Sequence, residues 1–368
     1  MNKKEIAEIK KQYKPEYSCM SKIAGCYVDK DKNKVLCFNV PFLSLPEEEM
    51  FKYFDIFKNS LIGKLGDKLF NLNFPLAQET AGGTQDYFYK LLNSQMDDDL
   101  LDSFYDKVVD TYDNPESYLI LVAEGMYDIP GKGLDDELMP DASDDVYHFL
   151  HICFCPAKFD KPELCYDPEK VCISDRKKGW VIGKPDNGIL YPAFNDRNTD
   201  LHAALYYGRS CKCMHRDFAQ ELTGCLLSLN SEEQLTSFRA MAEKLNCTYD
   251  QAEKIQTALY DIAEANADNV MPASVNKKEM VNLLKDCGIS DTKEAEDVFD
   301  STVGEDGVIV LDNVLPKKVL IETAGVSIKV DPERAQVVKR KEIDGREYLM
   351  IPIETGTEVS GISVKNYK

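Results

Sequence analysis

The sequence predicts an α+β fold, a mixed layered body of sheet and helices with an all-helical insertion and a β-rich C-terminal segment. Strand-like and helix-like stretches alternate over about the first 225 residues. Helices with clear start signals then dominate, and strand patterns return from Gly307 onward. We therefore expect an α+β domain over residues 1–228, a helical module over 229–303 and a β-rich segment over 304–368. The 368 residues are enough for more than one domain.

The chain opens with a charged amphipathic helix, MNKKEIAEIKKQYK, which has no apolar core typical of a secretory signal. Residues 21–43 read as a hairpin around the polar turn DKDKNK. A helix is expected after Pro46, because apolar side chains recur there at helical spacing. Residues 69–74 then read as a strand. The apolar side chains of the helix after Pro46 are Met50, Phe54, Phe57 and Leu61.

Further elements follow in the same alternating pattern. A helical stretch runs to about Tyr112, and the apolar runs SYLILVAEGMY and VYHFLHICFC read as strands. Residues 180–194 predict two strands joined by a Pro-Asp-Asn-Gly turn, with Trp180 packed in the core. The run LHAALYYG is expected to be a short helix. We expect the whole to form a two-layer body.

Capping patterns predict where the later helices begin. Ser231 with Gln234, Thr248 with Gln251, and Asn276 with Glu279 have the spacing of capping boxes. Gly288 can end the helix that Asn276 opens. In the C-terminal segment, Asp344-Gly345 lies between two strand-like runs and predicts a tight hairpin turn.

The charge of the chain is strongly negative and unevenly distributed. Forty-four basic and 64 acidic side chains give a net charge of −20, which opposes DNA and anionic membranes. Residues 97–145 hold sixteen acids and two lysines, a local charge of −14. A charge run is commonly a solvated face, but it can also dock a basic protein. The leading hypothesis is therefore a non-enzymatic cytoplasmic interaction protein with an acidic docking face, binding no DNA and no membrane.

Long stretches of the chain resemble one known family. They include FLSLPEEEMFKYFDIFK, the GGTQ loop, GWVIGKPDNGILYPAFNDRNTD and VDPERAQVVKRKEIDGREYLMIPI. These are similar to an uncharacterised bacterial family catalogued as domain of unknown function forty-three seventeen. The resemblance implies a bacterial cytoplasmic protein and supplies no activity, ligand or site.

A loop at Gly82-Gly83-Thr84-Gln85 has two readings. In the structural reading, the glycines permit a turn, Thr84 caps the following helix and Gln85 faces solvent in its first turn. In the functional reading, the loop resembles the Gly-Gly-Gln loop of peptide-release factors, and Gln85 would serve a ribosome-associated factor. Thr84 interrupts that motif.

Histidine and cysteine gather in two strand-like triplets. Alternation places His151, Cys153 and Cys155 on one face of a strand. Such ligands can bind zinc, but the segments are apolar enough to be core and the spacing is weakly diagnostic. We expect reduced thiols, no metal and no cofactor. The second triplet is Cys211, Cys213 and His215.

The densest polar run is Asn195–His202. Its Asp196, Arg197, Asp200 and His202 could form an acid/base or anion site in a hydrolase or transferase. Alternatively, Thr199 or Asp200 caps a helix while Arg197 pairs with a neighbouring acid. The motifs of the common nucleotide-binding, zinc-protease and serine-hydrolase enzymes are absent from the sequence, and whether the protein is an enzyme stays open.

Overall fold

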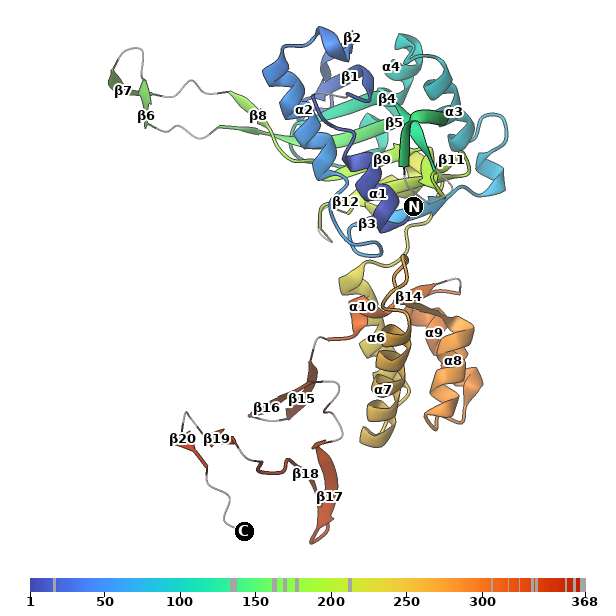
Figure 1. Ribbon diagram of the computed structural model, residues 1–368, viewed down its shortest axis with the longest axis vertical. Coiled ribbons are helices and arrows are strands. Elements are labelled where there is room, and N and C mark those ends of the chain that lie inside the picture. Colours follow the sequence, from blue (N-terminus) through green and yellow to red (C-terminus); the bar gives the residue numbers. More distant parts are fainter. Residues whose placement is uncertain are drawn as a thin grey trace. The chain divides into compact units, whose positions relative to one another are not determined.

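The computed structural model divides the chain into two compact units (Figure 1). The first comprises residues 1–236 with 269–272, and the second comprises 237–268 with 273–368. The structure describes residues 1–15, 18–132, 138–160, 164–167, 171–175, 179–210, 214–305, 307–316, 318–323, 325–331, 334, 337–354, 356–359 and 362–364.

The first unit is built on an eight-stranded sheet in the order β2-β1-β4-β5-β9-β12-β3, with β8 also paired to β5. Every pairing in this sheet is antiparallel. The strands are β1 (Met20–Val28), β2 (Lys34–Pro41), β3 (Leu69–Asn73), β4 (Tyr118–Lys132), β5 (Leu138–Phe159), β8 (Trp180–Ile182), β9 (Asn187–Tyr191) and β12 (Ala203–Gly208).

Helices cover both faces of this sheet, because its central strands are apolar on both sides. Along β5, Ile152 and Phe154 contribute to one core, and Cys153 and Cys155 contribute to the other. The first core includes side chains of α3 (Thr84–Asn93), α4 (Asp98–Thr111) and α5 (Arg216–Thr223), and the second includes side chains of α1 (Lys3–Lys10) and α2 (Glu47–Asn59). The α+β class is thus confirmed, but the expected two layers are three.

Short elements complete the first unit. They are η1 (Phe42–Ser44), η2 (Leu76–Gln78), the pair β6 (Leu164–Asp167) and β7 (Cys172–Asp175), and the pair β10 (Ala193–Asn195) and β11 (Asn198–Asp200). The predicted hairpin over 21–43 is confirmed by β1 and β2. The predicted helix after Pro46 and the strand at 69–74 are confirmed by α2 and β3.

Three local predictions about the strands of the first unit are wrong. The run read as a short helix is β12, whose six residues are all buried. A strand buried on both faces shows no alternation, so periodicity cannot distinguish it from a buried helix. The strands over 180–191 do not pair with each other, because β8 and β9 lie one after the other along β5. Trp180 is 51% exposed rather than packed in the core.

The second unit combines helices with small antiparallel pairs. The helices are α6 (Ser231–Lys244, whose first residues belong to unit 1), α7 (Tyr249–Ala265), α8 (Lys277–Asp286), α9 (Thr292–Thr302) and α10 (Leu311–Val314). The strand pairs are β13 (Ser274–Asn276) with β14 (Val308–Val310), β15 (Val319–Thr323) with β16 (Val326–Val330), β17 (Lys339–Ile343) with β18 (Arg346–Met350), and β19 (Glu358–Val359) with β20 (Ile362–Ser363).

The capping predictions hold at two of three helices. Thr248 and Asn276 form the predicted capping boxes at α7 and α8. The hairpin turn at Asp344-Gly345 is also confirmed, with φ values of 52° and 75°, as a type I′ turn requires.

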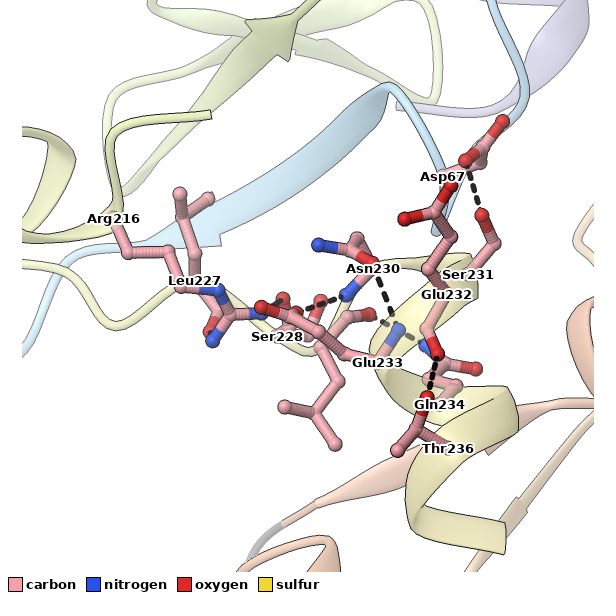
Figure 2. Close-up of polar contacts among 11 residues, drawn as sticks. Asp67, Arg216, Leu227, Ser228, Asn230, Ser231, Glu232, Glu233, Gln234 and Thr236 are labelled. Carbon is pink, nitrogen blue, oxygen red and sulfur yellow. Dashed lines mark hydrogen bonds and ion pairs between the residues drawn. The ribbon is translucent and has the colours of Figure 1, made fainter. Parts of the chain in front are cut away.

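The start of α6 differs from its prediction by one residue (Figure 2). Asn230 Oδ1 accepts the Glu233 N–H at 3.0 Å, and Glu233 Oε2 accepts the Asn230 N–H at 2.9 Å. Ser231 instead donates its hydroxyl to Asp67 at 2.5 Å. Both Asn230 and Ser231 fit the sequence pattern. The structure uses Asn230, and Glu233 Oε2 also accepts a hydrogen bond from the Arg216 guanidinium at 2.6 Å.

Replacing Asn230 by alanine is expected to lower the free energy of unfolding by about 1–2 kcal/mol, because the buried cap is lost. Ser231→Ala is expected to cost less, since it removes one hydrogen bond outside the capping box. Urea denaturation of both variants measures the difference, and a larger loss in Ser231→Ala contradicts the assignment of the cap.

Candidate functional site

The GGTQ loop is fixed by contacts within the fold. Gly83 is the N-cap of α3, and Thr84 is its first helical residue, so the expected Thr84 cap is wrong. The side chain of Gln78 acts in its place, since its Oε1 accepts the Thr84 N–H at 3.1 Å. The Thr84 hydroxyl donates to the carbonyl oxygen of Thr223 at 2.5 Å.

Gln85 lies in the first turn of α3, as predicted, but it is buried rather than solvent-facing. Its Nε2 donates to the Tyr191 hydroxyl and to the Leu201 carbonyl oxygen, each at 3.0 Å. The position of Gln85 in the helix does not predict this burial, because its partners are more than 100 residues away in the sequence, on β9 and in the turn before β12.

Gln85→Leu is expected to lower the free energy of unfolding by about 1–3 kcal/mol, because the buried Tyr191 hydroxyl and the partly buried Leu201 carbonyl oxygen lose their hydrogen-bond donor. Thr84→Ser, which keeps a hydroxyl, is expected to cost less. Thermal and urea denaturation test this order, and an unchanged stability in Gln85→Leu contradicts the structural role of the glutamine.

The polar run Asn195–His202 forms a hairpin turn and not a helix start. Asp196 and Arg197 have φ values of 52° and 55° between β10 and β11. Neither Thr199 nor Asp200 caps a helix, since β12 follows. Asp200 accepts the Asn195 amide at 2.6 Å and the His202 N–H at 3.0 Å.

The charged side chains of this run have separate partners. The Arg197 guanidinium pairs with Glu8 of α1 at 3.1–3.3 Å and donates to the Pro130 carbonyl oxygen at 3.2 Å. His202 is exposed, and its Nδ1 lies 2.9 Å from Glu79. The hydrogen bond to Glu79 raises the pKa of His202. Arg197 and His202 are thus engaged by different carboxylates.

A buried polar cluster surrounds His151 on the α1–α2 face of β5. The Ser60 hydroxyl donates to the Phe57 carbonyl oxygen at 2.7 Å, so its oxygen accepts from His151 Nε2 at 2.7 Å. Nδ1 is then the acceptor of the Tyr13 hydroxyl at 2.5 Å. Burial lowers the pKa of His151 to about 3, so the imidazole is neutral. The sequence gives no signal for this cluster, because its members are far apart in the chain.

The first histidine–cysteine triplet lies on one face of β5, and its side chains are buried. Burial raises the pKa of Cys153 to about 12 and also raises that of Cys155, so both are protonated thiols. Cys211 and Cys213 lie outside the described residues. His215 contacts the ring of Tyr112. Within the described ranges, no three histidine, cysteine or acidic side chains are grouped as a metal site would need.

An acidic stripe runs along the solvent face of α4. We define it as Asp99, Asp102, Asp106 and Asp110, with Asp113 just past the helix end; all are exposed. At 100° per residue the four helical members fall within an arc of about 80°. Buried side chains occupy the opposite side of α4, namely Leu101, Phe104, Tyr105 and Val108.

One cation lies within the stripe. Lys34 of β2 places its Nζ 2.6 Å from Asp102 and 2.5 Å from Asp106. Those two carboxylates nevertheless keep side-chain exposures of 60% and 59%. Within the part of the chain that the structure describes, Asp99, Asp110 and Asp113 form no ion pair. The stripe therefore presents uncompensated negative charge to solvent.

Comparison with known sequences identifies one family. The family described as domain of unknown function (DUF4317) matches residues 1–362. No curated protein matches the chain. Among the described helices, none combines the length and the apolar character that crossing a bilayer requires. The match extends over nearly the whole sequence, so this chain belongs to the DUF4317 family.

Proposed function

We propose that the protein is a non-enzymatic cytoplasmic interaction protein that binds a basic protein partner through the acidic stripe of α4. The observation that carries the proposal is the line of exposed carboxylates with Lys34 as its only described cation. A surface of one sign attracts partners of the opposite sign and speeds their association.

The stripe is unfavourable for the isolated helix. Like charges three or four residues apart destabilise a helix by about 0.2–0.5 kcal/mol per pair. Asp102–Asp106 and Asp106–Asp110 have the four-residue spacing. Lys34 offsets part of this repulsion, and a cationic partner would offset the rest. Helix stability therefore favours the bound state.

The other candidate residues have partners within the fold. Arg197 and His202 pair with different carboxylates, and Gln85 is held inside the fold. The alternative hypotheses are a hydrolase or transferase centred on Asn195–His202 and a ribosome-associated factor that uses the GGTQ loop.

Neutralising the stripe is expected to weaken partner binding about tenfold or more. The variant is Asp99→Asn/Asp110→Asn/Asp113→Asn, and the partner is first identified by crosslinking in the native cell. Association rates of wild type should also fall about tenfold between low and high salt, because screening acts over about 10 Å at 0.1 M.

The matched control removes three exposed acids of the second unit, Glu243→Gln/Asp286→Asn/Asp297→Asn, and so changes the net charge equally. It is expected to retain most of the affinity. Equal losses in both variants, or affinity independent of salt, would contradict the proposal.

A further inference from the structure

A groove lies between α2 and β8 on the face of the sheet opposite to the acidic stripe. It encloses about 640 Å³. Its apolar lining includes Ile56, Leu119, Ile182 and the indole of Trp180. The polar lining comes from α2 and consists of Glu49, Lys52, Tyr53 and Asp55.

Trp180 is the only tryptophan of the chain and is half exposed. Its ring packs at a steep angle against Tyr27, with centroids 6.4 Å apart, and against Phe159 at 5.4 Å. Phe159 is itself 53% exposed. These aromatic contacts orient the indole while leaving about half of Trp180 accessible to solvent.

The register of β8 with β5 determines which backbone groups lie on the outer edge of β8. Gly183 donates to the Pro156 carbonyl oxygen at 2.8 Å, and Asp160 donates to that of Gly179 at 2.9 Å. Since hydrogen-bonded and non-bonded pairs alternate in antiparallel ladders, the N–H and C=O groups of Trp180 and Ile182 point away from β5. In the described ranges, no second strand pairs with this edge.

An open strand edge is a template for another strand. A strand added there places a side chain directly beside Trp180 on the same face, with the two Cβ atoms about 4.5–5.5 Å apart. A tryptophan face attracts an ammonium or guanidinium group, and an apolar lining suits the aliphatic stem of lysine or arginine.

The charges of the groove favour the same occupant. Glu49 and Asp55 contribute two carboxylates, against one ammonium from Lys52. All three side chains lie on exposed positions of α2. The resulting field attracts a cation and repels an acidic side chain.

We propose that β8 binds an extended basic segment of a partner protein, which adds a strand to the outer edge and stacks a lysine or arginine side chain on Trp180. The main-chain hydrogen bonds supply affinity, and the aromatic, acidic groove supplies the preference for a cationic side chain. This site lies on a different face from the acidic stripe and does not depend on it.

Trp180 fluorescence tests the proposal directly, because no other tryptophan contributes to the signal. The probes are blocked nine-residue peptides of alternating threonine and valine with arginine, norleucine or glutamate at the centre. The arginine peptide is expected to shift the emission and to bind at least tenfold more tightly than the glutamate peptide. N-methylation of the residues facing β8 should abolish binding, whereas methylation of the alternate residues should leave it unchanged.

Variants of the groove provide the second test. Glu49→Gln/Asp55→Asn is expected to weaken binding of the arginine peptide about fivefold, and Lys52→Gln is expected to strengthen it. The triple variant of the acidic stripe should bind the peptide as wild type does, which separates this site from the function proposed above. Equal binding of the glutamate or norleucine peptide, or indifference to N-methylation, overturns the proposal.

Discussion

Lowering the pH from 7 to 4 is expected to reduce the free energy of unfolding by about 3 kcal/mol through His151 alone. The imidazole is buried between Tyr13 and Ser60, and both of its nitrogens have neutral hydrogen-bond partners. Burial lowers its pKa from 6.5 to about 3 in the folded protein. Protonation would place an unpaired charge in the core.

The direction of the pH dependence of stability follows from proton binding. Between pH 6.5 and 3, the unfolded chain binds a proton at His151 that the folded chain does not bind. Stability therefore falls as the pH falls through this window, by about 1.4 kcal/mol per pH unit once the unfolded histidine is fully protonated. Above pH 6.5 neither the folded nor the unfolded chain binds a proton at His151, so the contribution of His151 to stability is constant.

Urea denaturation at pH 7, 6, 5 and 4 measures the effect, with His151→Gln as the comparison. The variant is expected to be less stable at pH 7 but to lose less stability on acidification. His202→Gln is the control, because the exposed His202 has a raised pKa and its contribution is instead lost as the pH rises. An imidazole signal of His151 that titrates near pH 6.5 in the folded protein would contradict the prediction, whether or not the variant folds.

Local signals predicted much of the fold. The hairpin over 21–43, the helix after Pro46, the capping boxes at Thr248 and Asn276 and the turn at Asp344-Gly345 each depend on neighbours in sequence. Short-range patterns determine such features, since caps and turns have fixed residue spacing.

The errors have a common physical origin in long-range packing. The sequence of β12 predicts a helix, because burial on both faces removes the alternation that is typical of a strand. The sequence also predicts Trp180 in the core, yet this residue lies on an edge strand whose position depends on the register with β5. The burial of Gln85 likewise depends on Tyr191 and Leu201, which no local pattern connects to α3.

The acidic stripe of α4 could be predicted from the sequence only in part. The charge run was visible in the sequence, but its organisation required the helix boundaries of α4. Asp97 is the N-cap of α4. With the helix beginning there, the spacing of Asp99, Asp102, Asp106 and Asp110 places these side chains on one side. The contact of Lys34 with the stripe could not be read from the sequence, since it comes from β2.

Gly83→Ala is expected to be strongly destabilising, by about 3 kcal/mol or more. A Cβ atom at this position would lie 2.2 Å from the carbonyl oxygen of Gln78, 2.6 Å from its carbonyl carbon and 2.7 Å from its Cα. These are backbone atoms, so no side-chain rotation relieves the clash. Overpacking of this kind costs about 1–3 kcal/mol even where neighbours adjust, and here the start of α3 must move.

The neighbouring glycine is a matched control. Gly82 has φ of +90°, and a Cβ atom there meets nothing within 4 Å. Gly82→Ala is therefore expected to cost about 1–2 kcal/mol, from backbone conformation alone. Moving the start of α3 also disturbs the hydrogen bonds of Thr84 to Gln78 and of Gln85 to Tyr191, so Gly83→Ala should lose further stability that Gly82→Ala keeps. Urea denaturation of the two variants decides between them, and a loss in Gly82→Ala equal to or larger than that in Gly83→Ala would show that the close approach to Gln78 is not what requires glycine in this loop.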